Sequence, residues 1–343
     1  MNEDPVVGDL VVGPSTVVLG IETSCDETAA ALVMGGNDVL SSVVSSQIEL
    51  HATFGGVVPE IASRAHLELL NPVIARAIVE AGVEDRRIDA VACTIGPGLI
   101  GALLVGVSAA KALALAWDVP FVGVNHLEAH LYAALLDDPA IELPIVVLLA
   151  SGGHTMLVEM TDPGEYRVLG QTIDDAAGEA FDKVARFLGL GYPGGPAIER
   201  TALDGDGTAI AFPRAMRDEG LDVSFSGLKT SVMNHVRANP DVDTADVAAS
   251  FQTAVVDVLV HKARRAAAVV GAKGLALGGG VAANSELRER LLDACTADGL
   301  RAYLPSRAMC TDNAAMIAAA GWHRLRLDGP SELDTGAYPN LRL

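Results

Sequence analysis

The same short pattern occurs twice in this chain: an apolar run, a polar loop and a second apolar run. The first copy covers residues 17–21, the loop 22–28 and the run AAALV, and the second covers residues 145–150, the loop SGGH and the run TMLVEM. Uninterrupted runs of branched apolar residues bounded by polar loops are typical of buried strands. The duplication therefore predicts two related lobes, each with its own sheet, that face a nucleotide.

The chain is long enough and apolar enough to give each lobe a core. It has 343 residues, of which 50% are hydrophobic and 4% aromatic, so Val, Leu, Ala and Ile must fill the cores. Short apolar runs alternate with longer helical patterns, which predicts an α/β fold. We expect a flexible tail over 1–15, a first lobe over 16–136 and a second lobe over 137–311 with an irregular insert near 204–243. The last segment, 312–343, is expected to be a helix that packs back near the first lobe.

The net charge of −20 argues against a general nucleic-acid-binding protein, because such proteins are usually basic. The charge is distributed unevenly. Residues 1–140 carry 18 acidic and 5 basic side chains, whereas residues 141–343 carry 26 acidic and 19 basic side chains. If RNA is a partner, we expect it to dock mainly on the second half or through another subunit.

The cysteines and the N-terminus indicate a cytoplasmic protein. The four cysteines form no CxxC pair, which fits a reducing compartment. The first 15 residues are acidic and lack the basic start of a secretory signal. The most apolar window, residues 98–116, is rich in Gly and Ala and contains Lys111, so we interpret it as a buried helix and expect no membrane association.

The stretch KALALAWDVPFVGVNHLEAHL, residues 111–131, ends with two histidines four positions apart, His126 and His130. If His126 opens a helix, the two imidazoles lie on one face about one turn apart, a spacing that suits two nitrogen ligands of one metal ion. The pair directly follows a predicted strand over 119–124, where α/β proteins place their sites. An isolated HxxxH more often belongs to an ordinary helix, and a third ligand would have to come from elsewhere in the chain.

The same stretch carries a family signature. Its pattern K-A-x4-W-D-x-P-x-V-x3-H-x2-A-H-L closely resembles that of the TsaD family, also called Gcp or Kae, which are tRNA adenosine threonylcarbamoyltransferases once described as O-sialoglycoprotein endopeptidases. Further blocks of the family follow in the expected order: GGVVPEIASRAH at 55–66, LxSGGHT at 149–155, FSGLKT at 225–230, GGGVAAN at 278–284 and TDNAAMIA at 311–318. The resemblance therefore extends from the first strand to the last helix.

The resemblance implies a two-lobed fold of the actin-like ATPase class, which includes sugar kinases and heat-shock chaperones, with a mixed sheet and flanking helices in each lobe. It implies transfer of the threonylcarbamoyl group from threonylcarbamoyl-adenylate to the N6 amine of the adenosine 3′ of the anticodon in tRNAs that read ANN codons. It also implies that His126, His130 and Asp312, the Asp of TDNAAMIA, hold one divalent metal ion. We expect Fe²⁺ first and Zn²⁺ second. Both ions accept two imidazoles and a carboxylate and leave positions open for substrate.

The resemblance further implies substrate contacts in the second half, with an adenylate or ATP-type nucleotide in the cleft between the lobes. The implied contacts are Leu149, Ala150, Ser151, Gly152, Gly153, Asp182, Gly195 and Asn284, and Glu199 is an additional candidate at a position that is often Asp in the family. Glycine at 152 and 153 lets backbone approach a phosphate, and the amides of 151–153 are expected donors to phosphate or carbonyl oxygens. The alternatives are a surface ion pair for Asp182 and a helix cap for Asn284.

Three other groups of polar residues have weaker functional interpretations. The loop 22–28 resembles the first phosphate-binding loop of actin-like ATPases, which makes Glu22 and Ser24 additional candidates, although a plain hairpin turn is the alternative. Arg64 and His66 are expected on the solvated face of a helix. Lys229 and nearby arginines give the insert a cationic side that suits phosphates, unless these charges are simply solvated.

The partners that the resemblance implies are tRNA, a separate synthase that supplies the adenylate, a paralogous actin-fold protein of the TsaB type and a small ATPase of the TsaE type. An actin-fold phosphotransferase is the main alternative, although such kinases hold Mg²⁺ through carboxylates and phosphates and not through histidines. A metalloprotease would have HExxH. Here Glu128 lies two positions after His126, about 200° around the helix and away from a metal on that face. A chaperone-like ATPase without enzymatic transfer is a further alternative.

Overall fold

Two five-stranded mixed sheets with flanking helices form the protein, as the α/β prediction requires. The computed structural model describes residues 6–7, 10–83, 87–138 and 140–343. The chain divides into two units: unit 1 comprises Met1–Pro139 and Asp312–Leu343, and unit 2 comprises Ala140–Thr311. Unit 1 is therefore built from two segments of chain, with the whole of unit 2 between them.

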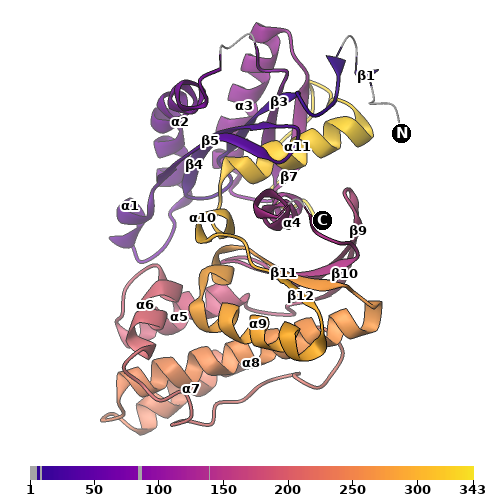
Figure 1. Ribbon diagram of the computed structural model, residues 1–343. Coiled ribbons are helices and arrows are strands. Elements are labelled where there is room, and N and C mark those ends of the chain that lie inside the picture. The colour runs from indigo at the N-terminus through magenta and orange to yellow at the C-terminus, as the bar shows by residue number, and fades with distance from the viewer. Residues whose placement is uncertain (1–5, 8–9, 84–86, 139) are drawn as a thin grey trace. The chain divides into compact units, whose positions relative to one another are not determined.

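The sheet of unit 1 has the strand order β5-β4-β3-β6-β7 (Figure 1). Its strands are β3 (Val17–Glu22), β4 (Glu27–Met34), β5 (Asp38–Ser46), β6 (Ala90–Gly96) and β7 (Phe121–Asn125). β3, β4 and β5 are antiparallel neighbours, whereas β3, β6 and β7 are parallel. The carboxyl ends of the three parallel strands consequently meet at one edge, where α/β folds place their sites.

Helices cover this sheet. They are α1 (Ile48–Ala52), α2 (Pro59–Ala81), α3 (Ile100–Trp117), α4 (His126–Asp137) and α11 (Ala314–Asp328), and a short hairpin of β1 (Val6–Val7) and β2 (Leu10–Val11) precedes the sheet. α11, yellow in Figure 1, packs on β3, β4, β6 and β7 and against α4. A Cβ at Gly20 of β3 would lie 2.2 Å from the backbone oxygen of Ala314. Glycine at this position therefore lets α11 rest directly on the strand.

α3 is, among the described residues, the one helix that is long and apolar enough by length and composition to cross a membrane. It packs on β6 and α2, and its buried face is made of small and branched residues that include Ala102, Leu103 and Val107. Its opposite face leaves Leu104 and Leu115 at 50% and 66% exposure. The helix expected over 98–116 is therefore half-buried against a sheet and leaves an apolar face exposed.

Unit 2 repeats the arrangement of unit 1. Its strands are β8 (Ile145–Ala150), β9 (Thr155–Asp162), β10 (Glu165–Gln171), β11 (Gly274–Gly278) and β12 (Arg301–Tyr303), in the order β10-β9-β8-β11-β12. β8, β9 and β10 are antiparallel, whereas β8, β11 and β12 are parallel. The predicted duplication is thus present strand for strand.

Most helices of unit 2 lie between β10 and β11 in the sequence, and the others come after β11 and β12. They are α5 (Ala177–Leu188), α6 (Gly194–Ala202), α7 (Ser226–Ala238), α8 (Thr244–Val270), the 3-10 turn η2 (Gly280–Ala283), α9 (Ser285–Asp298) and α10 (Arg307–Cys310). α8 contacts β8, β9 and β11 and carries much of the apolar core of this unit. The expected irregular insert contains a regular helix, because Leu228 and Val232 of α7 recur at helical spacing and are buried.

Two expectations for the chain ends are wrong. Part of the expected flexible tail lies outside the described residues, but Val12 is fully buried and the carbonyl of Gly13 accepts a hydrogen bond of 3.2 Å from the indole of Trp322. The expected C-terminal helix ends at Asp328. Gly329 at a positive φ and the proline after it end the helix, because proline cannot continue the hydrogen-bond ladder.

Candidate functional site

His126, His130 and Asp312 come together in unit 1. One ligand atom from each lies within 4.8 Å of the others. Oδ1 of Asp312 lies 3.5 Å from Nε2 of His126 and 3.2 Å from Nε2 of His130, and the two ring centroids are 4.8 Å apart. Two imidazole nitrogens and one carboxylate oxygen therefore converge on a single point, although Asp312 is 182 residues beyond His130 in the sequence.

Local structure explains this convergence. α4 begins at His126, directly after β7, because the side chain of Asn125 accepts hydrogen bonds from the amides of Leu127 and Glu128 and caps the helix. The spacing of four then places both imidazoles on one face of α4. Asp312 directly precedes Asn313, whose side chain caps α11 through the amide of Met316. The packing of α11 against α4 brings the carboxylate to the two rings.

His130 is the residue that best fits a metal ligand. Its side chain is fully buried, and within the described part of the chain neither ring nitrogen makes a hydrogen bond. Nε2 faces Asp312 at 3.2 Å but outside hydrogen-bonding geometry. Buried polar side chains without a partner are rare and demand an explanation, and a bound cation would supply one. Two imidazoles and one carboxylate are a donor set that suits Fe²⁺ and Zn²⁺.

The other nitrogen of His126 is held by Glu22. Oε2 of Glu22 lies 2.9 Å from Nδ1 of His126 and accepts a hydrogen bond of 2.6 Å from the hydroxyl of Thr94, while Oε1 accepts one of 2.5 Å from the amide of Ser24. A carboxylate only accepts, so Nδ1 carries the proton and Nε2 is left to face Asp312 and His130.

The charges of this cluster shift the pKa values of both partners. Burial lowers the pKa of His126, but the carboxylates of Asp312 and Glu22 outweigh burial and raise it to about 9. Burial raises the pKa of Glu22, yet the charge and hydrogen bond of His126 keep it below its usual value. His126 is consequently protonated at neutral pH when no ion is bound, and a metal ion must displace the proton on Nε2.

Glu22 and Ser24 were additional candidates for a phosphate-binding loop, but both side chains point inward. Glu22 is completely buried, and Ser24 is 2% exposed with its hydroxyl 3.3 Å from Nδ1 of His126. The carbonyl of Ser24 also accepts a hydrogen bond of 2.8 Å from the amide of Leu99. The side chains of Glu22 and Ser24 therefore both support His126.

A second buried network, centred on His66, was missed from the sequence. His66 was expected on a solvated face but is fully buried; its Nδ1 lies 2.8 Å from the hydroxyl of Thr28, and its Nε2 lies 3.0 Å from the carbonyl of Cys25. Arg64, in contrast, is exposed and pairs with Glu60 as expected of a solvated face. The spacing of His66 four residues after the buried Ala62 is the signal that places it on the inner stripe of α2.

The glycine-rich loop of unit 2 lies between α5 and the turn after β11. A Cβ at Gly178 of α5 would lie 2.5 Å from the carbonyl oxygen of Ser151, and a Cβ at Gly279 would lie 2.5 Å from that of Ala150. Glycine at these two positions therefore lets the backbones approach. Gly152 and Gly153 at the tip of the loop are exposed, whereas Leu149 and Ala150 are buried in β8 and present only backbone.

One of the three amides expected to hold substrate oxygens is already used. The amide of Ser151 donates a hydrogen bond of 2.8 Å to the carbonyl of His154, and the hydroxyl of Ser151 accepts one of 3.2 Å from the amide of His154. These bonds close the tight turn between β8 and β9. The amide of Ser151 is therefore engaged in the turn, and contact of Ser151 with substrate stays a prediction.

The other predicted substrate residues lie on α5, on α6 and at the start of α9. Asp182 of α5 accepts a hydrogen bond of 2.7 Å from the amide of Gly194, next to Gly195, where a Cβ would meet open space. Asn284 caps α9 through the amide of Leu287 and donates a hydrogen bond of 2.8 Å to Gln252. Glu199 of α6 accepts a hydrogen bond of 2.9 Å from the amide of Ser285. These contacts link α5 to the start of α6 through Asp182 and Gly194, and α6 to the start of α9 through Glu199 and Ser285.

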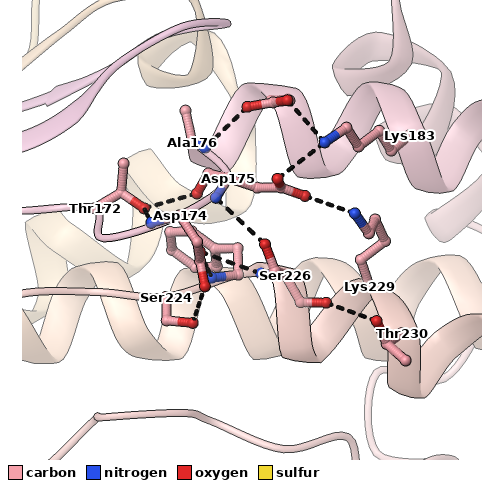
Figure 2. Close-up of polar contacts among 11 residues, drawn as sticks. Thr172, Asp174, Asp175, Ala176, Lys183, Ser224, Ser226, Lys229 and Thr230 are labelled. Atoms are coloured by element: carbon pink, nitrogen blue, oxygen red, sulfur yellow. Dashed lines mark hydrogen bonds and ion pairs between the residues drawn. The ribbon is translucent and has the colours of Figure 1, made fainter.

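Two adjacent carboxylates hold α5 to α7 (Figure 2). Asp175 accepts hydrogen bonds of 2.9 Å from both Lys183 and Lys229, and Asp174 accepts one of 2.5 Å from the hydroxyl of Ser224. Burial raises the pKa of Asp175, but the hydrogen bonds and charges of the two lysines lower it below its usual value. Lys229 was expected on a free cationic side, yet its side chain is only 23% exposed and is committed to this ion pair.

Comparison with known proteins connects this arrangement to one family. The family model of TsaD, tRNA N6-adenosine threonylcarbamoyltransferase, matches residues 38–319. A relative of that name from Symbiobacterium thermophilum is 55% identical over 330 residues, which cover 95% of this chain and 97% of the relative. Another from Geobacter sp. strain M21 is 53% identical over 327 residues, with coverage of 94% and 95%.

Solved structures support the fold. HypF from T. kodakarensis is similar with a TM-score of 0.64 and 17% identity over 92% of this chain and 48% of that chain. Component A of the (R)-2-hydroxyglutaryl-CoA dehydratase from Acidaminococcus fermentans is similar with a TM-score of 0.55 and 14% identity over 90% and 99%. These similarities confirm the two-lobed actin-like ATPase fold and, at such low identity, bear on the fold alone.

Proposed function

Because this chain belongs to the TsaD family, the tRNA N6-adenosine threonylcarbamoyltransferases, we propose that it modifies tRNA in the cytoplasm. The group that moves is threonylcarbamoyl, from threonylcarbamoyl-adenylate to the N6 amine of the adenosine 3′ of the anticodon in tRNAs that read ANN codons. The N6 nitrogen bonds to the carbamoyl carbon and loses one proton. The bond from that carbon to the phosphate oxygen breaks, and AMP leaves with the electron pair.

The observation that carries this proposal is the cluster of His126, His130 and Asp312, in which the buried imidazole of His130 makes no hydrogen bond to any described residue. The exocyclic amine is a poor nucleophile and the carbamoyl carbonyl a poor electrophile, so the reaction needs a group that positions and polarises the carbonyl. A divalent ion, Fe²⁺ first and Zn²⁺ second, would supply that polarisation as a Lewis acid. The three side chains would hold the ion, and Glu22 would keep the proton of His126 on the nitrogen that faces away from it.

The loops of unit 2 are the proposed place of the adenylate. The exposed tip at Gly152 and Gly153 lets phosphate oxygens reach backbone amides without a Cβ in the way. Asp182, Gly195 and Asn284 are proposed to contact the nucleoside and threonyl parts, and Glu199, which accepts a hydrogen bond from the amide of Ser285 next to Asn284, is an additional candidate. The role of these residues is to orient the carbonyl for attack.

A metalloprotease is disfavoured by the position of its would-be general base. Glu128 has a side chain that is 4% exposed and pairs with Arg324 at 2.8 Å and 3.0 Å, so its carboxylate is neutralised by a cation. A general base must reach the attacking water or its proton. An actin-fold phosphotransferase remains the second hypothesis and is one outcome of the test below.

The test is a reconstituted transfer reaction. It contains threonine, bicarbonate, ATP, the adenylate synthase, the TsaB-type and TsaE-type partners and an ANN-decoding tRNA, and the modified nucleoside is measured by mass spectrometry after digestion. We expect product with this chain, none with His126→Ala, and normal product with His261→Ala, a half-buried histidine of α8 in unit 2. Product that survives His126→Ala would refute the metal role but keep the transferase. No product with a complete partner set would favour the phosphotransferase.

We further propose that the TsaB-type partner binds the exposed apolar face of α2 and α3. Leu67 is 66% exposed and Leu104 is 50% exposed, and both line one groove between the two helices. Large apolar side chains gathered in one groove are typical of a protein-binding surface. Leu67→Asp should abolish the complex in size-exclusion chromatography, whereas Val269→Asp, also at 66% exposure but on α8, should not. Self-dimers lost with Leu67→Asp would instead assign this face to a second copy of the chain.

A further inference from the structure

The C-terminal segment after α11, residues 331–342, runs along the last strand of the sheet of unit 1. We call this segment the C-terminal strap. The amide of Ser331 donates a hydrogen bond of 2.8 Å to the carbonyl of Phe121 at the start of β7, and the hydroxyl of Ser331 accepts one of 2.9 Å from the amide of Gly123. The side chain of Lys111 also donates to the carbonyl of Thr335. The strap therefore covers backbone groups of an edge strand that would otherwise face solvent.

Farther along, the strap contacts the end of β6 and the loop that follows it. The register between β6 and β7 passes from Thr94 to Gly96, which leaves Ile95 without a partner in β7. The carbonyl of Ile95 accepts a hydrogen bond of 2.7 Å from the amide of Tyr338 instead, and the amide of Gly98 donates one of 3.2 Å to the carbonyl of Pro339. The β-bulge thus exposes the acceptor that the strap uses.

The last contact reaches the start of the histidine helix. The side-chain nitrogen of Asn125 donates a hydrogen bond of 2.8 Å to the carbonyl of Arg342, while its side-chain oxygen caps α4. An amide satisfies both bonds in only one of its two orientations. The carbonyl of Arg342 therefore stabilises the same orientation of the Asn125 amide that the cap of α4 requires.

These contacts lie beside the groups that orient His126. Thr94, one residue before Ile95, donates to Glu22, and Leu99, one residue after Gly98, donates to the carbonyl of Ser24. The strap thus braces the ends of β6 and β7 at the points where they support Glu22, Ser24 and α4. Ligands hold a metal tightly only when their supporting groups are themselves fixed to within a fraction of an ångström.

We propose that the C-terminal strap is a positioning element of the metal site. Its residue Tyr338, and Asn125, which the strap contacts through Arg342, are the positioning residues. This inference rests on the metal site of the proposed function. It predicts that loosening the strap weakens metal binding although no strap residue is a ligand. A segment that only covered the sheet edge would affect folding stability and leave the metal affinity of the folded protein unchanged.

The test uses point variants of the full chain and two measurements, the Kd for Co²⁺ by competition with a chromophoric chelator and the Tm of the metal-free protein. Tyr338→Pro removes the amide that bonds Ile95, whereas its control, Tyr338→Ala, keeps the amide. Asn125→Asp keeps an oxygen to cap α4 but removes the donor to Arg342. We expect the Kd to rise about 10-fold or more with Tyr338→Pro and Asn125→Asp, as for lost supporting groups in other metal sites, and to stay unchanged with Tyr338→Ala.

The outcomes separate the two proposals. If the unaltered protein binds no Co²⁺, the proposed metal site itself is wrong. If it binds Co²⁺ and the Kd of Tyr338→Pro and Asn125→Asp equals that of the unaltered protein, the inference about the strap is overturned, even when the Tm falls. An equal rise of the Kd with Tyr338→Ala would also overturn it, because the side chain and not the strap hydrogen bond would then be responsible.

Discussion

Substitution of Glu22 by glutamine is the sharpest test of how the proposed metal site is organised. The change keeps the size of the side chain and removes its charge. Glu22 is completely buried, and its two oxygens accept from Ser24, Thr94 and His126. An amide has one oxygen and one NH₂ group, so it cannot accept all three bonds in either orientation.

Each orientation of the new amide has a different consequence. If its oxygen stays toward His126 and Thr94, the NH₂ group meets the amide of Ser24, and an unpaired buried donor costs about 1–3 kcal/mol. If the oxygen turns to Ser24, the NH₂ group donates to Nδ1 of His126 and selects the tautomer with the proton on Nε2. That nitrogen faces Asp312 and His130, and a protonated nitrogen cannot bind a metal ion.

We therefore expect Glu22→Gln to weaken metal binding about 10- to 100-fold, or about 1.4–2.7 kcal/mol. Competition of Co²⁺ or Zn²⁺ with a chromophoric chelator at pH 7.5 measures this change. The control is Glu159→Gln in unit 2, which neutralises a glutamate at 8% exposure whose partner is Arg167. Glu22→Gln with an unchanged metal Kd would refute the claim that Glu22 sets the tautomer of His126.

Three further predictions concern folding. Asp175→Asn removes the charge and one of the two oxygens that accept from Lys183 and Lys229, at a site with 14% exposure, and should lower the free energy of unfolding by about 1–2 kcal/mol in urea titrations. Glu179→Gln, which breaks an exposed pair within α5, should change it by less than about 0.5 kcal/mol, and equal effects of the two substitutions would contradict this prediction. Burial, aided by a nearby arginine, lowers the pKa of His323 to about 4. The unfolded chain takes up this proton near pH 6.5, so stability should fall as pH drops from 6.5 toward 4, by up to about 3 kcal/mol, and His323→Phe should lessen that fall; an unchanged pH profile would count against it. Gly20→Ala places a Cβ 2.2 Å from a backbone oxygen of α11 and should cost about 1–3 kcal/mol, while Gly227→Ala, which meets open space on α7, should not destabilise; comparison of the two Tm values decides.

The local sequence pattern predicts the pair of histidines but not the residues that pack around them. His126 and His130 share a helix, so their relation follows from a spacing of four residues. Asp312 lies on a distant segment, and only the family resemblance connected it to the pair. Glu22 and His66 depend on packing between elements far apart in the chain, which no local period encodes, and both were assigned to solvent-facing or substrate-facing positions before the fold was known.

The same limit explains which strands were missed. β3, β4, β8 and β9 contain the continuous apolar runs that the sequence predicts as strands. β5 and β10 are edge strands with largely exposed side chains, so their residues lack the apolar run that marks a buried strand. Pairing with β4 and β9, and not their own composition, makes them strands.

Because unit 1 is built from two segments of chain, an ion at the proposed metal site would also affect the stability of this unit. α4 is the last helix of the first segment, and Asp312 is the first residue of the second. An ion bound to His130 and Asp312 would cross-link the two segments and close a ring of 182 residues that contains all of unit 2. Because the ion leaves when its ligands separate, its contribution to stability depends on its affinity for the folded site, and an ion concentration of 100 times the Kd would add about 2.7 kcal/mol. Metal removal would therefore lower the Tm at which the two segments of unit 1 separate.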